Sequence, residues 1–336
     1  MNQNNEFTVG VDVGNAETKS SHKDFVSGFK VYSKLPFGCS PDSYILFNGK
    51  YYVLTQEKFP YVEDKTKDEK MFILTLIAIA KEIYFVMENR YKNDEHTLER
   101  IRQGISDVKN VNLGVGLPPS HVAMQKDDVK NYYKEMCGAG EISYEYNGMT
   151  FSYRIGNIGI FPQNYAVVAS TNQNEKSSII VKDVDNGFYT LDFGGYTLDK
   201  IAIINGKLDI SQCDSMSKGI VTLCDQLIAQ LRNDKGINLT ETYVINILKG
   251  KKVMVGDDVV NAVKEYAKQW TFEVLDALTQ SGVEFKLYPV VFMGGTSLLL
   301  REFIEQYPLL KEHEFITDSH ANAEAYRKLM KSGKGR

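Results

Sequence analysis

The chain is poor in cysteine, proline and tryptophan, and it has no long hydrophobic run. Its 336 residues include four cysteines, eight prolines and one tryptophan. The cysteines form no Cys-x-x-Cys pair and the five histidines form no ligand-spaced cluster, so neither a disulfide framework nor a zinc site is indicated. The longest apolar run, Phe72 to Ala80, is interrupted by Thr75 and is far shorter than the roughly 20 residues that span a bilayer. We therefore expect no membrane partner.

The sequence also shows no targeting signal, no net positive charge and no P-loop. Residues 1–5 have neither the basic nor the apolar part of a signal peptide, so we expect a cytoplasmic protein. The net charge of -4 argues against a chain that itself coats nucleic acid, so any DNA contact is expected to pass through a partner. No Gly-x-x-x-x-Gly-Lys-Ser/Thr motif occurs. The length and the 43% hydrophobic content predict an ordinary globular protein of two domains.

One pattern occurs twice, once in each half of the chain. Val11-Asp12-Val13-Gly14 runs on to Thr18-Lys19, and Leu191-Asp192-Phe193-Gly194-Gly195 runs on to Thr197. Each copy is an apolar strand that reaches a carboxylate and then a glycine turn. Such a turn exposes backbone N–H groups beside the carboxylate, which suits a phosphate and its magnesium ion. Two copies indicate two loops that bind one nucleotide.

The rest of the chain predicts an α/β fold. Three Asn-Gly dipeptides, at 48–49, 147–148 and 205–206, predict hairpins, so much of the sheet is antiparallel. Helices are predicted over 71–91, from Met216 to Leu231 behind a cap at Asp214 or Ser215, over 259–278 and over 321–330. A strand over 288–293 opens onto Gly294-Gly295-Thr296. The charged segment 64–70 is interpreted as a solvated loop.

The order of these turns resembles a known superfamily. A turn after Asp12, a proline turn at Phe161-Pro162-Gln163, a turn after Asp192 and the Gly294-Gly295 turn follow one another as in actin, heat-shock chaperones and sugar kinases. The segment from Leu191 to Asp199 is most similar to the plasmid-segregation actins of the ParM/StbA group. The resemblance implies an actin-like fold, in which two related α/β domains with mixed sheets flank a nucleotide cleft.

The expected domains follow from this resemblance. Domain I covers 1–165, with a smaller inserted subdomain at about 30–70. Domain II covers 166–336, with a helical subdomain at about 215–285 and a last helix at about 321–332 that packs back on domain I.

The resemblance also implies a role for each residue of the turns. Asp12 and Asp192 hold magnesium through water, and both count among the catalytic residues. The remaining nucleotide-binding positions are Gly14, Asn15, Ala16 and Lys19 for the first phosphate turn, Gly194 and Gly195 for the second, Gly294, Gly295 and Thr296 under the adenosine, and Ser217, Lys218 and Gly219 beside the base and ribose. A side chain at Gly294 or Gly295 is expected to clash with the nucleotide.

Gln163 takes the position that orients the attacking water. A neutral amide orients water but is a poor base, so hydrolysis is expected to be slow. The alternative is that Gln163 only begins a helix and bonds to the backbone.

Three functions compete at this point. The first is an actin-like ATPase that polymerises with ATP (or GTP) and Mg²⁺ into filaments that segregate bacterial plasmids, with a DNA-binding adaptor on a centromere-like site as partner. The second is a metabolite or sugar kinase of the same superfamily, which needs a spare carboxylate as general base. The third is a scaffold that does not polymerise.

Overall fold

The computed structural model of the chain describes residues 5–62, 64–171, 179–182 and 185–333, so the N-terminal residues 1–4 used in the targeting argument lie outside it. The chain divides into two compact units. Unit 1 comprises Met1–Ser170 and His320–Arg336, and unit 2 comprises Thr171–Ser319. The expected boundary at 165/166 therefore shifts by a few residues. The last helix, which the sequence analysis counted with domain II, belongs to unit 1.

Unit 1 contains a mixed sheet of nine strands within the described residues. The order is β3-β2-β1-β7-β9-β8-β5-β6-β4, with β1, β7 and β9 parallel. The strands are β1 (Glu6–Val13), β2 (Glu17–Lys19), β3 (Asp24–Val26), β4 (Phe29–Tyr32), β5 (Tyr44–Phe47), β6 (Lys50–Leu54), β7 (Asn110–Leu117), β8 (Ile142–Tyr146) and β9 (Met149–Pro162). The helices are α1 (Lys70–Tyr91), α2 (Thr97–Ser106), α3 (Pro119–Cys137), α4 (Tyr165–Ser170) and α11 (Ala321–Lys331), with short 3-10 turns η1 (Pro41–Ser43) and η2 (Lys65–Lys67).

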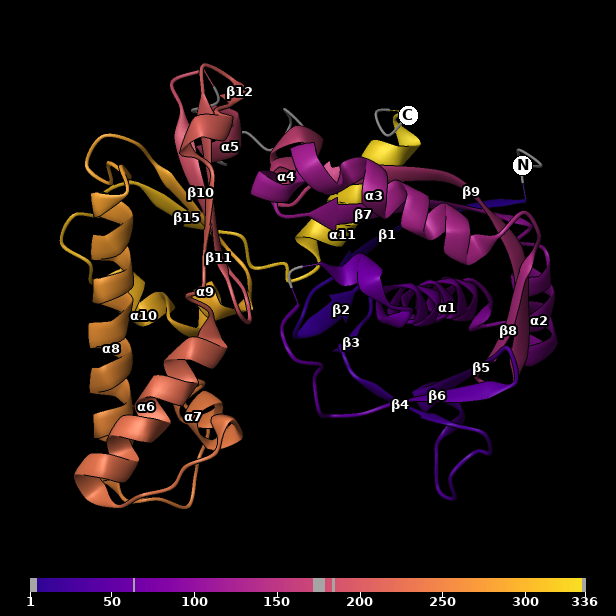
Figure 1. Cartoon of the computed structure of the whole chain (residues 1–336), viewed down its shortest axis with the longest axis horizontal. Helices are drawn as coiled ribbons and strands as arrows, with labels where there is room; N and C mark the ends of the chain where they lie inside the picture. The colour runs from indigo at the N-terminus through magenta and orange to yellow at the C-terminus, as the bar shows by residue number, and fades with distance from the viewer. Residues whose placement is uncertain (1–4, 63, 172–178, 183–184, 334–336) are drawn as a thin grey trace. The chain divides into compact units, whose positions relative to one another are not determined.

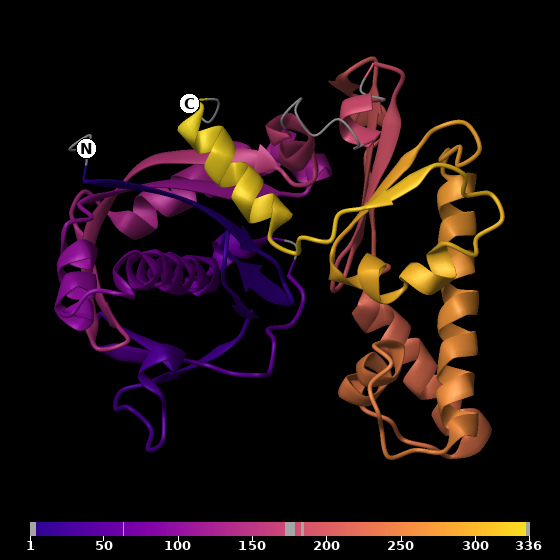
Figure 2. The same cartoon turned by 180° about the vertical axis from the view of Figure 1, so that it is seen from behind.

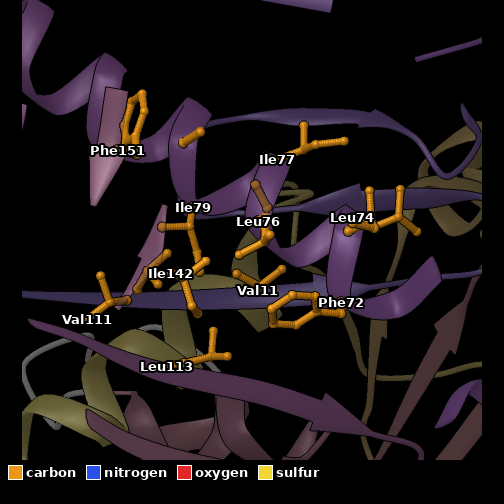
Figure 3. Close-up of a cluster of buried hydrophobic side chains, with 14 of the residues drawn as sticks. Val11, Phe72, Leu74, Leu76, Ile77, Ile79, Val111, Leu113, Ile142 and Phe151 are labelled. Carbon is orange, nitrogen blue, oxygen red and sulfur yellow. The ribbon is translucent and has the colours of Figure 1, made fainter. Parts of the chain in front are cut away.

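Helix α1 forms the centre of unit 1. The sheet curves around it, with β1, β7 and β9 on one side and β4, β5 and β6 on the other (Figure 1). Its residues from Met71 to Ala80 are all buried, which explains an apolar run that shows little helical periodicity. In Figure 3, Phe72 and Leu76 lie against Val11 of β1 and Leu113 of β7. The long apolar run is therefore a core helix.

Helix α11 covers the opposite face of the same strands (Figure 2). Three glycines, Gly10, Gly114 and Gly159, lie side by side in register across β1, β7 and β9. A Cβ atom on Gly10 would overlap the carbonyl oxygen of Ala323 in α11, and one on Gly159 would overlap a methionine of the same helix. The helix can approach these strands only because the row has no side chains.

Unit 2 contains a six-stranded mixed sheet within the described residues, of order β12-β11-β10-β14-β15, with β13 also paired to β11. The strands are β10 (Phe188–Phe193), β11 (Leu198–Ile204), β12 (Lys207–Leu208), β13 (Asp214–Met216), β14 (Val290–Met293) and β15 (His313–Phe315). The helices are α5 (Ile179–Lys182), α6 (Ile220–Lys235), α7 (Glu241–Leu248), α8 (Asp257–Gln280), α9 (Gly295–Leu299) and α10 (Arg301–Ile304), with the 3-10 turn η3 (Ile210–Gln212). The core under α8 includes the only tryptophan, Trp270.

All three predicted Asn-Gly hairpins are confirmed. Asn48-Gly49 joins β5 to β6, Asn147-Gly148 joins β8 to β9, and Asn205-Gly206 joins β11 to β12. Both residues of each pair have positive φ angles, from 48° to 72°. Two-residue hairpin turns of this type match the twist of the strands they join, and Asn-Gly adopts them at little cost.

The predicted start of the helical segment near 215 is wrong. Asp214 and Ser215 cap no helix, because Asp214–Met216 forms β13 and pairs with β11. Helix α6 begins at Ile220 behind Gly219, which offers no side-chain cap. Its first N–H groups instead donate to the carbonyls of Gly194 and Gly195, 3.3 and 3.0 Å away.

In the part of the chain that the structure describes, we find no helix with the length and apolar character needed to cross a bilayer.

The glycine row gives a test of the packing under α11. Gly10→Ala should lower the free energy of unfolding by about 1–3 kcal/mol, because the added methyl group collides with the α11 backbone. Urea unfolding followed by circular dichroism measures the change. Gly140→Ala is the matched control, since a Cβ there meets no atom within 4 Å. An unchanged Gly10→Ala protein would show that α11 can move away from the sheet without cost.

Candidate functional site

The first glycine turn joins β1 to β2 in unit 1. The two strands form an antiparallel hairpin in which Asp12 lies opposite Lys19. Ser27, which is buried, donates its hydroxyl to the Gly14 carbonyl at 2.7 Å and its N–H to the Ala16 carbonyl at 3.0 Å. The side chains of Asn15 and Ala16 are half-buried. Two hydrogen bonds from the buried Ser27 thus hold the backbone of the predicted phosphate turn.

Gln163 lies at the same turn, although it is 151 residues from Asp12. Its side-chain Nε2 donates to Asp12 Oδ1 at 2.8 Å, and its backbone N–H donates to the Leu117 carbonyl at 2.8 Å. The strands explain this meeting, because β1, β7 and β9 are parallel and end at the same edge of the sheet. The Gln163 side chain therefore lies at the carboxylate of the first turn.

Lys19 stands beside the turn but already has an acidic partner. Its Nζ lies 3.2 Å from Glu17 Oε2, and its side chain is 17% exposed. A phosphate at this position would have to compete with the Glu17 carboxylate for the Lys19 ammonium group.

Helices α1 and α11 both form hydrogen bonds to the turn between β2 and β3. Glu82 of α1 is almost fully buried and accepts hydrogen bonds from the Ser20 hydroxyl at 2.7 Å and from the His22 N–H at 3.1 Å. The His22 Nδ1 also lies 2.6 Å from Glu82 Oε1. At the start of α11, His320 Nδ1 is 2.8 Å from the Ser20 carbonyl oxygen. The turn between β2 and β3 is therefore tied to both α1 and α11.

The second glycine turn joins β10 to β11 in unit 2 and repeats the geometry of the first. Asp192 lies opposite Asp199, seven residues along the chain, as Lys19 lies seven residues after Asp12. In both units the strand that carries the aspartate pairs antiparallel on one side and parallel on the other. The Gly194 N–H closes the turn on the Thr197 carbonyl at 2.8 Å. The sequence repeat therefore corresponds to a repeat of structure.

The predicted base and ribose segment supports this turn. The Gly219 N–H donates to the Tyr196 carbonyl at 3.0 Å, and a Cβ on Gly219 would overlap the Gly195 backbone. Ser217 is exposed and Lys218 is half-buried. The structure gives Gly219 a packing role under the second glycine turn.

The third turn, at Gly294-Gly295-Thr296, lies against the second. Thr296 donates its hydroxyl to the Gly194 carbonyl at 2.8 Å. Gly294 has a φ of 82°, and a Cβ there would overlap the Asp192 carboxylate and the Phe193 carbonyl. Gly295 differs, because a Cβ there meets nothing within 4 Å. The protein itself thus requires glycine at 294, while only a bound ligand would require it at 295.

The predicted residues therefore form two sets, one in each unit. Unit 1 brings together Asp12, Gly14, Asn15, Ala16, Lys19 and Gln163, and unit 2 brings together Asp192, Gly194, Gly195, Ser217, Lys218, Gly219, Gly294, Gly295 and Thr296. Within the described ranges there is no group of three or more His, Cys, Asp and Glu side chains able to hold a metal. Mg²⁺ does not need such a group, because it is commonly bound by one or two carboxylates together with waters and phosphate oxygens.

Two supports of the first turn were not predicted from the sequence. Ser27 carries no motif that would have singled it out. Lys65 belongs to the charged segment that was interpreted as a solvated loop, but its Nζ donates to the Val13 carbonyl at 2.5 Å. That interpretation is wrong for Lys65, while its neighbour Lys67 is indeed exposed.

No protein-family model and no curated protein matches the sequence. Solved structures match along nearly the whole chain. The apo psk41 ParM protein is 14% identical with a TM-score of 0.65, and the match covers 98% of each chain. A ParM from Clostridium botulinum, solved as a 15-stranded filament, is 17% identical with a TM-score of 0.68, over 98% of this chain and 100% of that one.

An archaeal actin homolog, Ta0583, solved in complex with ADP, is also similar. It is 15% identical with a TM-score of 0.64, and the match covers 97% of this chain and 99% of that one. The chain therefore has an actin-like α/β fold, which confirms the predicted fold class.

Substitutions at the two adjacent glycines of unit 2, Gly294 and Gly295, test folding and ligand binding separately. Gly294→Ala should lower the free energy of unfolding of the ligand-free protein by about 1–3 kcal/mol, through overlap with Asp192 and a strained φ. Gly295→Ala should change it by less than about 0.5 kcal/mol. It should nevertheless weaken ATP binding at least about tenfold if adenosine passes over this turn. Urea unfolding and titration calorimetry with ATP measure the two effects, and unchanged ATP affinity in Gly295→Ala would contradict the adenosine assignment.

Proposed function

We propose that this chain is an actin-like ATPase that polymerises with ATP into filaments that segregate plasmid DNA. One observation carries the proposal. The Asp-x-Gly hairpin occurs in both units with the same seven-residue register, and Gln163 is hydrogen-bonded to the aspartate of the first copy. A structural hairpin has no need for a repeated carboxylate, a glycine turn and a bound amide together. A nucleotide held by two phosphate turns needs all three.

The backbone of the turns would bind the phosphates. Gly14, Asn15 and Ala16 in unit 1 and Gly195 in unit 2 would offer N–H groups at tight turns, the arrangement that suits anions, while Gly194 closes the second turn with its own N–H. Asp12 and Asp192 would hold Mg²⁺ through its water ligands, and the ion would neutralise charge on the phosphates when bound. Gly294, Gly295 and Thr296 would lie under the adenosine (or guanosine). The ADP complex of Ta0583 supports nucleotide binding by this fold.

Gln163 would orient the water that attacks the terminal phosphate. Its amide nitrogen is bonded to Asp12, so its carbonyl oxygen is the end that would accept a hydrogen bond from water. An amide removes no proton at neutral pH, so the gain comes from positioning and the rate should be low. Slow hydrolysis suits a protein whose polymer should persist for a time and then disassemble.

Polymer formation is supported by the relatives, two of which were solved as filaments, Alp12 and the Clostridium botulinum ParM. Copies would add head to tail through a contact that does not close into a ring. Loss of the terminal phosphate would then weaken the lattice. The net charge of -4 agrees with indirect DNA contact in the cytoplasm, through an adaptor bound to a centromere-like plasmid site.

The proposed role of Gln163 predicts that its substitution slows hydrolysis and leaves nucleotide affinity nearly unchanged. Gln163→Ala should slow phosphate release about 10²-fold, because water loses its positioning group, while ATP affinity changes less than about threefold. Steady-state phosphate release and nucleotide titration measure the two quantities. Gln269→Ala is the control and should leave both unchanged, because Gln269 is exposed on α8 and its side chain donates to Glu273. Wild-type hydrolysis by Gln163→Ala would show that Gln163 only supports Asp12.

Assembly gives the second test of the proposed function. With ATP and Mg²⁺ at micromolar protein, light scattering should rise, the protein should pellet, and electron microscopy should show filaments. Asp192→Ala should not assemble under these conditions, because it lacks one of the two carboxylates proposed to hold Mg²⁺. Nucleotide binding without any assembly by the wild-type protein would argue against a filament. Assembly and hydrolysis by Asp192→Ala at the wild-type rate would contradict the magnesium site.

A further inference from the structure

Ser27 contacts the first glycine turn at two of its carbonyl groups. It is 1% exposed and lies between β3 and β4, outside the Asp-x-Gly pattern. Its hydroxyl donates to the Gly14 carbonyl at 2.7 Å, and its backbone N–H donates to the Ala16 carbonyl at 3.0 Å. The Thr18 hydroxyl lies 2.9 Å from the Ser27 hydroxyl. Since a hydroxyl has one hydrogen, which Ser27 gives to Gly14, Thr18 is the donor to Ser27.

The second glycine turn shows the same two contacts, made by other residues. The Gly194 carbonyl, two positions after the aspartate like that of Gly14, accepts the Thr296 hydroxyl at 2.8 Å. The carbonyl two residues further on, that of Tyr196, accepts the Gly219 N–H at 3.0 Å. In each turn a hydroxyl therefore binds the first glycine carbonyl and an N–H binds the carbonyl two residues later. A pattern repeated with unrelated residues indicates that both turns need this peptide orientation.

The hydrogen bond to Gly14 fixes the direction of the next N–H group. A trans peptide unit is planar, so the Asn15 N–H points opposite to the Gly14 carbonyl of the same unit. The carbonyl points toward the buried Ser27, and the Asn15 N–H therefore points away from it. If this peptide rotated, an anion at the turn would meet a carbonyl oxygen, which repels it, in place of an N–H group, which attracts it.

We propose that Ser27 positions the first turn for phosphate binding by holding the peptide between Gly14 and Asn15 with its N–H directed toward the phosphates. The inference rests on the proposed function and adds a positioning residue from outside the predicted motif. Ser27 acts through the backbone, because its own hydroxyl is occupied by Gly14 and Thr18. Backbone N–H groups bind the phosphates before and during hydrolysis alike. Their displacement therefore weakens binding more than it slows the chemical step.

The experiment compares variants of the full chain by calorimetric titration with ATP and by steady-state phosphate release, both with Mg²⁺. Ser27→Ala removes the hydroxyl and keeps the backbone N–H, while Ser27→Thr keeps both. Thr75→Val is the matched control, because Thr75 is a fully buried residue of α1 whose hydroxyl contacts the Met71 carbonyl and the Tyr133 hydroxyl, each at 2.8 Å. Thermal unfolding without nucleotide measures the stability of every variant.

Ser27→Ala should raise the Kd and the KM for ATP about tenfold to a hundredfold, and lower kcat less than about threefold. Ser27→Thr should stay within about threefold of the wild type in all three quantities. Thr75→Val should bind ATP like the wild type, although it lowers the unfolding temperature. This pattern is the reverse of that expected for Gln163→Ala, in which the rate falls and the affinity is kept.

Further variants keep the test decisive if one of these proteins does not fold. Ser27→Cys then replaces Ser27→Ala, because a thiol fills the same space but is a weak donor, and it should weaken ATP binding at least about threefold. If Ser27→Thr is unstable, the comparison of Ser27→Ala with Thr75→Val decides alone.

Two results would overturn the role of Ser27 while the proposed function stands. One is ATP affinity equal to that of the wild type in a folded Ser27→Ala protein. The other is an equal loss of ATP affinity in Thr75→Val, which would show that the loss of any buried hydroxyl in unit 1 disturbs the turn. A wild-type protein that neither binds ATP nor releases phosphate would instead refute the proposed function, and the inference with it.

Discussion

The close approach of α11 to three parallel strands is the contact on which unit 1 depends. Gly10, Gly114 and Gly159 lie in one row, and the helix backbone lies where their side chains would be. The start of α11 also forms hydrogen bonds near the proposed site. At the start of α11, Asn322 accepts the Asn164 N–H at 2.8 Å, next to Gln163 in the chain, and His320 contacts the Ser20 carbonyl. Helix α11 therefore also helps to position both residues of the proposed hydrolytic site, because β1 carries Asp12 and β9 leads to Gln163.

Unit 2 achieves the same turn with different supports. Helix α6 donates its first N–H groups to the carbonyls of Gly194 and Gly195, and Thr296 donates its hydroxyl to Gly194. In unit 1 Ser27 holds the carbonyls of Gly14 and Ala16, and Lys65 donates to the Val13 carbonyl. The hydrogen bonds from α6 give partners both to the first N–H groups of the helix, which have none within it, and to the carbonyls of the turn. Helix α6 therefore needs no capping side chain. The two hairpins therefore share a register, but different residues support their turns.

Local signals predicted most elements and missed those that depend on distant pairing. The Asn-Gly turns, α1, α8 and α11 were predicted because turn chemistry and helical periodicity are contained within a few neighbouring residues. The sequence predicts a helix start where the short strand β13 lies, because three residues that pair with a distant strand show no periodicity of their own. It predicts a solvated Lys65, because a charged segment does not show which of its residues contacts the sheet.

The sequence by itself determined the α/β class, the paired Asp-x-Gly turns and the Gln163 turn, because each is encoded by adjacent residues. Tertiary structure alone decided what these features do together. It brought Gln163 within hydrogen-bond distance of Asp12 and Lys65 within hydrogen-bond distance of Val13, and it packed Gly114 and Gly116 of β7 against Tyr326 of α11. These contacts join residues that are 52 or more positions apart. Their geometry follows from the edge at which parallel strands end and from which face a helix covers, and a linear pattern contains neither.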